Sequence, residues 1–298
     1  MRFGVIAMQI GSLIPNGMTS EELLVHVKDY EHSKLVEKLT VLGFDIIELS
    51  GDIGLFLPHT LEPGSIEDLK LLKQQRGLTY TVHLPLWSIE PSTPSLSVRE
   101  GSVEAIINCI HAVEPLDPEI YVLHATGALA SEFYRMPLPE LANQYLLRQF
   151  QNNAHTSILE ILKKTGLKSR RLAIETIEFP FDLTMELAED LDLSFCLDTG
   201  HVLVGFAGPI EIFDALEQCL PYLGEIHLHD GPWQGPNRDI GYGKDHQALG
   251  RGDLDVARLL DRLDVAGFDG PVILELNLES ALESLEYIRS IRPELLSI

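Results

Sequence analysis

The sequence predicts a single (β/α)₈ barrel, an α/β fold in which eight parallel strands alternate with helices. Three observations favour it. Short apolar runs rich in β-branched residues recur eight times along the 298 residues. Longer segments with helical periodicity separate them, and metal-ligating residue types stand at the end of most runs. Eight strands close such a barrel, and barrels of ~250 residues or more commonly form one unit. We therefore expect residues 1–298 to form one domain.

The eight runs predict strands that are buried on both faces, as parallel strands covered by helices usually are. In chain order they are Phe3–Ala7, Phe44–Leu49, Leu78–His83, Ile120–His124, Leu172–Thr176, Leu193–Asp198, Glu225–His229 and Val272–Leu276.

Segments with helical periodicity lie between these strands. They are Ser20–Leu42, Ser65–Gln75, Ser97–Ala112, Pro139–Thr165, Leu183–Asp190, Pro209–Cys219, Leu254–Leu263 and Ser280–Ile288. The first begins at a hydroxyl followed by two acids, a pattern that caps a helix and suits its positive end. Two long polar connections, Leu84–Leu96 and Gly231–Asp253, each follow a strand and are therefore expected to be substrate loops.

Composition excludes several classes of protein. The chain has 22 Lys and Arg against 45 Asp and Glu, a formal net charge of −23. Nucleic-acid binding depends on neutralising phosphates with basic side chains, so no nucleic-acid partner is expected. No run reaches the ~20 apolar residues of a membrane span, and the N-terminus has no signal-peptide pattern. Three widely spaced cysteines favour neither disulfides nor a zinc knuckle, so we expect a cytoplasmic protein.

The residues at the ends of the predicted strands carry the functional information. The carboxyl ends of barrel strands form the mouth where barrel enzymes keep their sites, and carboxylate and imidazole side chains suit a divalent metal. These residues are Glu48, His83, His124, Glu175, Asp198, His201, His227, His229, Asp230 and Glu275, to which the last long loop adds Asp245 and His246.

This ordered series resembles the xylose isomerase-like TIM barrel superfamily, which includes sugar phosphate isomerases and epimerases and the AP endonuclease family 2. The resemblance covers nearly the whole chain. It rests on Thr81-Val82-His83-Leu84-Pro85, Tyr121-Val122-Leu123-His124, Ala173-Ile174-Glu175, Leu197-Asp198-Thr199-Gly200-His201, Ile226-His227-Leu228-His229-Asp230, Asp245-His246-Gln247-Ala248-Leu249-Gly250-Arg251-Gly252 and Leu274-Glu275.

The resemblance to the epimerases implies one metal held by Glu175, Asp198, His227 and Glu275. It further implies that the metal stabilises an enediolate of a sugar, sugar phosphate or polyol while Glu175 and Glu275 act as acid and base. His201 would orient the substrate. This isomerase or epimerase is the function that the sequence favours, with hydrolysis a close second.

The resemblance to endonuclease IV implies more ligands and more than one metal, with His83, His124, His201 and His246 added. One departure is that Asp245 and His246 are adjacent, whereas the related pattern often separates the acid and the histidine by one residue. A full set would suit hydrolysis of a phosphoester. The charge counts against DNA and leaves a small phosphodiester open, for example in cobamide remodelling.

Several other residues are candidates for substrate binding. Trp87 and Trp233 follow strands that end in metal ligands, His229 belongs to the seventh strand end, and Arg251 could pair with a phosphate. The metal expected is Mn²⁺ or Zn²⁺, with Mg²⁺, Co²⁺ or Fe²⁺ also compatible. The partner expected is a small sugar or phosphate-containing molecule, and a homo-oligomer stays open. A third hypothesis is a non-catalytic barrel that binds a metal or ligand.

Overall fold

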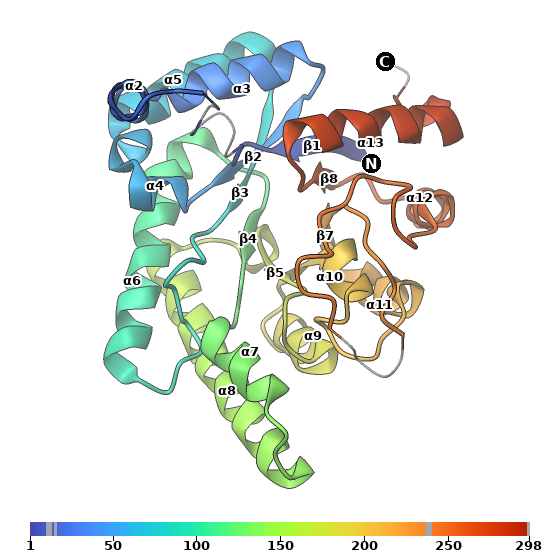
Figure 1. Cartoon of the computed structure of the whole chain (residues 1–298). Helices are drawn as coiled ribbons and strands as arrows, with labels where there is room; N and C mark the ends of the chain where they lie inside the picture. The colour runs from blue at the N-terminus through green and yellow to red at the C-terminus, as the bar shows by residue number, and fades with distance from the viewer. Residues whose placement is uncertain (10–13, 15–16, 236–239, 297–298) are drawn as a thin grey trace.

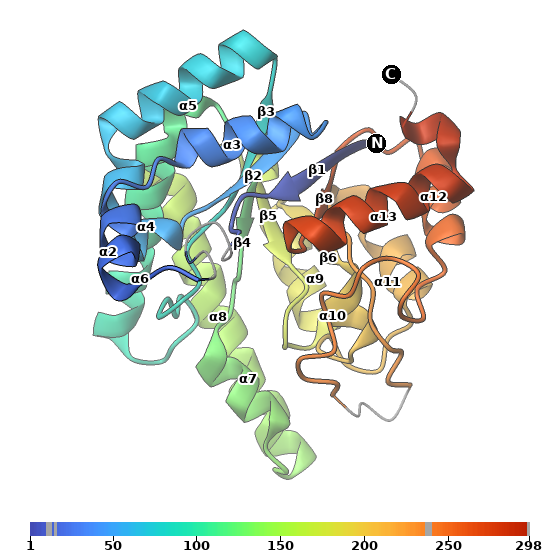
Figure 2. The same cartoon turned by 45° about the horizontal axis from the view of Figure 1, so that its top comes forward.

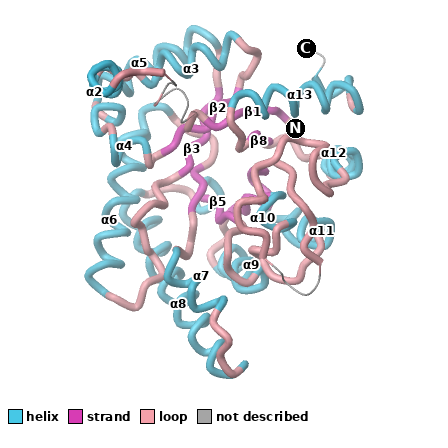
Figure 3. Tube along the Cα trace, in the orientation of Figure 1, coloured by secondary structure: helices cyan, strands magenta, loops and turns pink. Residues whose placement is uncertain are grey.

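The computed structural model describes residues 1–9, 14, 17–235 and 240–296. Eight parallel strands form a closed barrel in chain order, with helices around it (Figures 1 and 3). The strands are β1 (Arg2–Ile6), β2 (Ile46–Ser50), β3 (Thr79–His83), β4 (Tyr121–Leu123), β5 (Leu172–Glu175), β6 (Ser194–Asp198), β7 (Leu223–His227) and β8 (Pro271–Leu274). The predicted (β/α)₈ barrel is confirmed.

The barrel closes where the first strand meets the last. Gly4 pairs with Ile273 across β1 and β8, and every other strand pairs with its neighbour in sequence. Every residue of β2, β4, β5, β6 and β8 is buried. This burial on both faces explains why the strands are continuous apolar runs without alternation.

The helices that cover the barrel follow the predicted segments within a few residues at seven of the eight positions. They are α5 (Pro63–Arg76), α6 (Leu96–Val113), α8 (Glu140–Thr165), α9 (Phe181–Asp190), α11 (Ile212–Cys219), α12 (Val256–Val265) and α13 (Leu278–Ile291). None of the helices in the described part of the chain combines the length and the hydropathy that a membrane crossing requires.

The prediction of one helix over Ser20–Leu42 was wrong. The structure has two helices there, α2 (Ser20–Lys28) and α3 (His32–Val41). α2 begins with a capping box between Thr19 and Glu22 and buries none of its residues, whereas α3 buries four. The chain breaks at Tyr30, whose carbonyl accepts a hydrogen bond from His59 Nε2.

Short helices at the strand ends were not predicted. They are α4 (Ile53–Phe56), α7 (Ala128–Arg135) and α10 (Thr199–Leu203). α7 packs on α8, with the Phe133 and Phe150 rings 5.6 Å apart, and both extend beyond the rest of the barrel (Figure 2). The second predicted substrate loop, Gly231–Asp253, includes residues 236–239, which lie outside the described residues.

Candidate metal centre

The carboxyl ends of the strands bring the predicted ligands together at one mouth of the barrel. β3, β5, β6 and β7 end at a ligand, and a ligand follows directly after β4 and β8. All four ligands of the first predicted set and all four additional histidines lie in three adjoining groups. The eight residues are His83, His124, Glu175, Asp198, His201, His227, His246 and Glu275.

Glu175 lies between two of these groups. Its Oε2 accepts hydrogen bonds from His83 Nε2 at 3.1 Å and from His124 Nε2 at 2.8 Å. Its Oε1 accepts a hydrogen bond from His227 Nδ1 at 3.1 Å. The two oxygens of one buried carboxylate therefore face different sets of imidazoles.

The first set consists of His83, His124 and Glu175, and the second of Glu175, Asp198, His227 and Glu275. In the second set His227 Nδ1 also lies 3.1 Å from Glu275 Oε2 and 3.9 Å from Asp198 Oδ2. Within each set the ligand atoms all lie within 4.8 Å of one another. Ligands bound ~2.1 Å from one cation stand no more than ~4.2 Å apart, so this spacing is close to that of a loaded site.

The third set consists of His201, His229 and His246. The rings of His229 and His246 are stacked with centroids 4.1 Å apart. Asp245 Oδ2 lies 2.6 Å from His246 Nδ1 and 3.9 Å from His201 Nε2. The adjacency of acid and histidine along the chain therefore does not keep Asp245 away from this set. His229 Nε2 donates to Asp198 Oδ2 at 2.8 Å, which joins the third set to the second.

The turn after β6 explains how His201 reaches the mouth. Asp198 caps α10 by accepting a hydrogen bond from the backbone N–H of His201 at 2.7 Å. Capping starts the helix at once and turns His201 back over the strand end. Gly200 is needed because the imidazole of His229 lies where a Cβ would stand.

Asp230, which ends the seventh predicted strand, holds the following loop instead of joining a ligand set. Its two carboxylate oxygens accept backbone N–H groups of Gly231 at 2.8 Å, Gly250 and Gly252 at 2.9 Å and Leu254 at 3.0 Å. These hydrogen bonds fix both ends of the loop that carries His246, a member of the third set.

Two buried glutamates lie below the second set. His227 Nε2 donates to Glu48 Oε2 at 3.2 Å and lies 3.5 Å from Glu225 Oε1, which also accepts from Thr81 Oγ1 at 3.3 Å. Glu48 was predicted from the sequence as a candidate at a strand end, but Glu225 was not. Its signal was present, because Glu225 is two residues before His227 and strand side chains two apart share a face.

Burial and charge shift the pKa values of these groups strongly. Burial raises the pKa of Asp198 to about 7. Burial alone would lower the pKa of His83, but the hydrogen bond to Glu175 and the nearby carboxylates raise it to about 10. At His246 burial is likewise outweighed by the neighbouring carboxylates of Asp245 and Glu275, and the pKa is about 11.

The residues present fit divalent cations. The ligand sets offer imidazole nitrogens and carboxylate oxygens without thiolate, the combination that suits Zn²⁺ and Mn²⁺. Among the described residues, Glu275 Oε2 is buried without a hydrogen-bond partner, and so are Glu48 Oε1 and Glu225 Oε2. Buried carboxylates need paired positive charge. His83 and His246 hold protons strongly because carboxylates surround them, and divalent cations can neutralise the same negative charge.

A cleft of about 530 Å³ opens beside the ligand sets, and His124, His201 and Trp87 line it. The other residues predicted to bind substrate lie elsewhere. Arg251 is exposed and its guanidinium pairs with Glu283. Trp233 packs against the hydrophobic core and donates its backbone N–H to Asp253. Because the carboxylate of Glu283 on α13 faces this guanidinium, we expect Arg251 to contribute little to binding a phosphate.

Comparisons with known proteins agree with this architecture. Residues 36–291 match the family described as "Xylose isomerase-like TIM barrel". An uncharacterized protein of Methanocaldococcus jannaschii, MJ1311, is 25% identical over 299 positions, covering 97% of this chain and 88% of the relative.

Two solved structures are similar over nearly their full length. One is a D-tagatose 3-epimerase-like protein, with 23% identity, a TM-score of 0.71 and coverage of 99% of this chain and 98% of the other. The other is endonuclease IV from Thermus thermophilus, with 19% identity, a TM-score of 0.66 and coverage of 99% and 100%. At these identities both similarities concern the fold alone.

Proposed function

The chain belongs to the xylose isomerase-like TIM barrel family, and from this premise we propose that it is a multi-metal hydrolase of a small phosphodiester. The observation that carries the proposal is the position of Glu175, whose two oxygens face separate ligand sets. A carboxylate shared in this way can hold two metals side by side, the arrangement that clamps the attacking and leaving oxygens of a phosphoryl group.

Each of the three sets would hold one divalent cation, Zn²⁺ or Mn²⁺. They are His83, His124 and Glu175; Glu175, Asp198, His227 and Glu275; and His201, His229 and His246 with Asp245 beside them. When bound, such cations polarise a phosphoryl oxygen and lower the pKa of water.

The cleft supplies little positive charge of its own. Among the described residues that line it there is no Lys or Arg, and Glu90 and Glu178 are acidic. An anionic substrate would therefore be drawn to the ligand sets themselves, at His124 and His201. With a net charge of −23, the surface repels a long polyanion, so a small diester suits the site better than DNA.

A sugar isomerase or epimerase is the second candidate. The set of Glu175, Asp198, His227 and Glu275 also suits a single cation with two acid–base glutamates, and several similar solved structures are named as epimerases. Against it, His83 and His124 both donate to Glu175 Oε2. A glutamate held by two imidazoles is better suited to ligation than to repeated proton transfer.

The test is metal content per chain together with hydrolysis of bis(4-nitrophenyl) phosphate. The wild type and a His83→Ala/His124→Ala variant are purified without chelator and compared with a control, His111→Ala/His155→Ala, which removes two histidines of the outer helices α6 and α8. We expect two or three metals in the wild type and in the control. The site variant should lose about one metal and at least ~100-fold of its diesterase activity.

One metal per chain, unchanged in the site variant, together with no diester hydrolysis, would reject the proposal. The isomerase would then be favoured, and Glu275→Gln should abolish sugar interconversion while His124→Ala is tolerated. A protein that loads metal but turns over neither class of substrate would instead be a binding barrel.

A further inference from the structure

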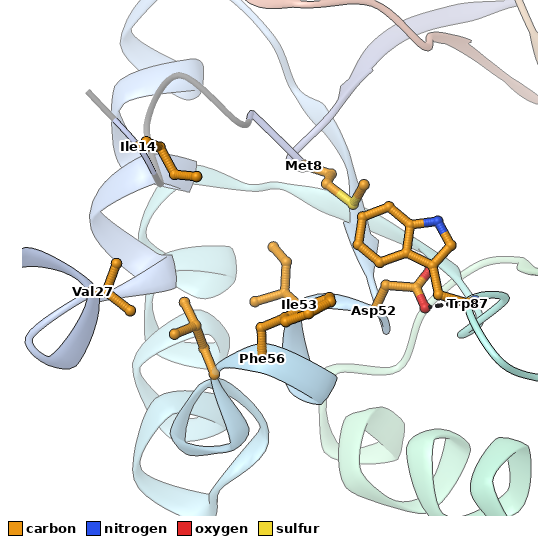
Figure 4. A pocket seen from close by; sticks show the side chains of 8 residues that line it. Met8, Ile14, Val27, Asp52, Ile53, Phe56 and Trp87 are labelled. Atoms are coloured by element: carbon orange, nitrogen blue, oxygen red, sulfur yellow. Dashed lines mark hydrogen bonds between the residues drawn. The ribbon is translucent and has the colours of Figure 1, made fainter. Parts of the chain in front are cut away.

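A second cavity, of about 320 Å³, adjoins the metal cleft and shares Trp87 with it. Its volume lies within the range of small-molecule sites. Figure 4 shows its side chains converging from the end of β1, from α2, from α4 and from the loop after β3. Six of them are Met8, Val27, Ile53, Phe56, Leu57 and Trp87.

The cavity is chemically distinct from the cleft. Its wall is aliphatic, aromatic and thioether, and the charged side chain among its lining residues is Asp52. That carboxylate is 1% exposed and already accepts the backbone N–H groups of Leu86 and Trp87, each at 3.1 Å. Asp52 is therefore occupied by the loop, and the cavity offers apolar contact without an available charge.

The backbone that carries Trp87 is held by hydrogen bonds to Asp52. Asp52 holds the backbone of Trp87, and the next residue, Ser88, has a left-handed φ of 63° that turns the chain away. The Phe56 and Trp87 rings meet edge to face, 5.5 Å apart at 74°. Both side chains stay solvent-accessible, at 68% for Phe56 and 42% for Trp87. An exposed aromatic pair of this kind gains most when a flat ring covers it.

We propose that this cavity binds a neutral, planar aromatic ring of the substrate, while the phosphodiester of the same molecule lies at the ligand sets in the cleft. The placement of the phosphodiester at the ligand sets rests on the proposed function. Trp87 links the two halves because it lines both spaces. Aromatic and thioether groups favour a ring over an alkyl chain, and the absence of a free carboxylate among the described lining residues favours a neutral ring over a cation.

The ring site is tested by ¹⁹F NMR of protein labelled with 5-fluorotryptophan. The chain has two tryptophans, and a Trp233→Phe variant assigns their resonances. Titration with indazole, a neutral fused ring, should shift the Trp87 resonance saturably and leave that of Trp233 in place, whereas cyclohexanol should bind more weakly. Phe56→Ala should weaken indazole binding about 10-fold, the upper range for an aromatic pair.

The matched control is Leu55→Ala, which changes an exposed apolar residue on the same short helix that does not line the cavity. It should bind indazole like the wild type. An unmoved Trp87 resonance, or equal binding by Phe56→Ala and Leu55→Ala, would overturn the inference.

Kinetics separate this inference from the function on which it rests. Phenyl and methyl diesters of 4-nitrophenyl phosphate are compared, and Phe56→Ala should raise KM about 10-fold for the phenyl diester alone. If both diesters are cleaved and the variant affects them equally, the ring site is wrong and the hydrolase stands. If indazole binds at Trp87 but no diester is cleaved, the hydrolase is wrong and the ring site stands.

Discussion

Asp230→Asn should destabilise the protein strongly, because Asp230 is fully buried and each of its oxygens accepts two backbone N–H groups. An asparagine keeps one acceptor oxygen, so two of the four N–H groups lose their partner whichever way the amide turns. Each buried N–H left without an acceptor costs about 1–3 kcal/mol. The expected loss is therefore about 4 kcal/mol.

Thermal unfolding followed by circular dichroism measures this loss. At about 2–4 °C per kcal/mol for a chain approaching this size, Tm should fall by about 8–16 °C. The matched control is Asp253→Asn, because Asp253 is exposed and, within the described residues, its side chain accepts a single backbone N–H, that of Trp233. The loop held by Asp230 also carries His246, so the variant should lose metal from the third set first. A Tm within ~3 °C of the control would refute the argument that this carboxylate anchors the loop.

Three further predictions follow from single positions. Gly200→Ala inserts a Cβ against the His229 ring, so metal content should fall by about one per chain, while Gly101→Ala, whose Cβ meets nothing within 4 Å, should change nothing. Burial lowers the pKa of His32 from 6.5 to about 4, so the folded state binds fewer protons than the unfolded state between these pH values, and stability falls as pH decreases through that window. In urea unfolding, His32→Leu should reduce the stability lost between pH 6.5 and pH 5 by about 2 kcal/mol, and an unchanged loss would contradict the assignment. Arg251→Ala should alter diesterase kcat/KM less than about 2-fold. A 100-fold loss would show instead that Arg251 binds the substrate.

Sequence patterns predicted the barrel well because its strands are buried on both faces. Runs such as Leu172–Thr176 follow a polar turn, here Ser169–Arg171, and their order along the chain is the order in the barrel. Boundaries were less accurate where burial continues past the strand: β7 begins at Leu223, two residues before its predicted start, and ends at His227. The apolar Leu228 stays buried outside the strand, so hydropathy alone could not mark the end.

The ligand positions were predictable because parallel strands end at one mouth, but their grouping was not. Nothing in the sequence says that Glu175 directs one oxygen to His83 and the other to His227, since that depends on side-chain rotation. The same limit applies to Arg251, whose partner Glu283 lies on a helix that begins after the last strand. The helix break at Tyr30 depends on tertiary burial that local periodicity cannot record.

The pairing of β1 with β8 has a consequence for how the protein is made. Synthesis delivers β1 first and its partner last, so the hydrogen-bonding edge of β1 stays open until residues 271–274 have emerged. An open strand edge can pair with other chains, and such long-range closure is slow. Glu275 follows β8 directly, so the second ligand set is completed by the same residues that close the barrel. A nascent chain that ends before β8 is thus both prone to association and short of one residue of the second ligand set.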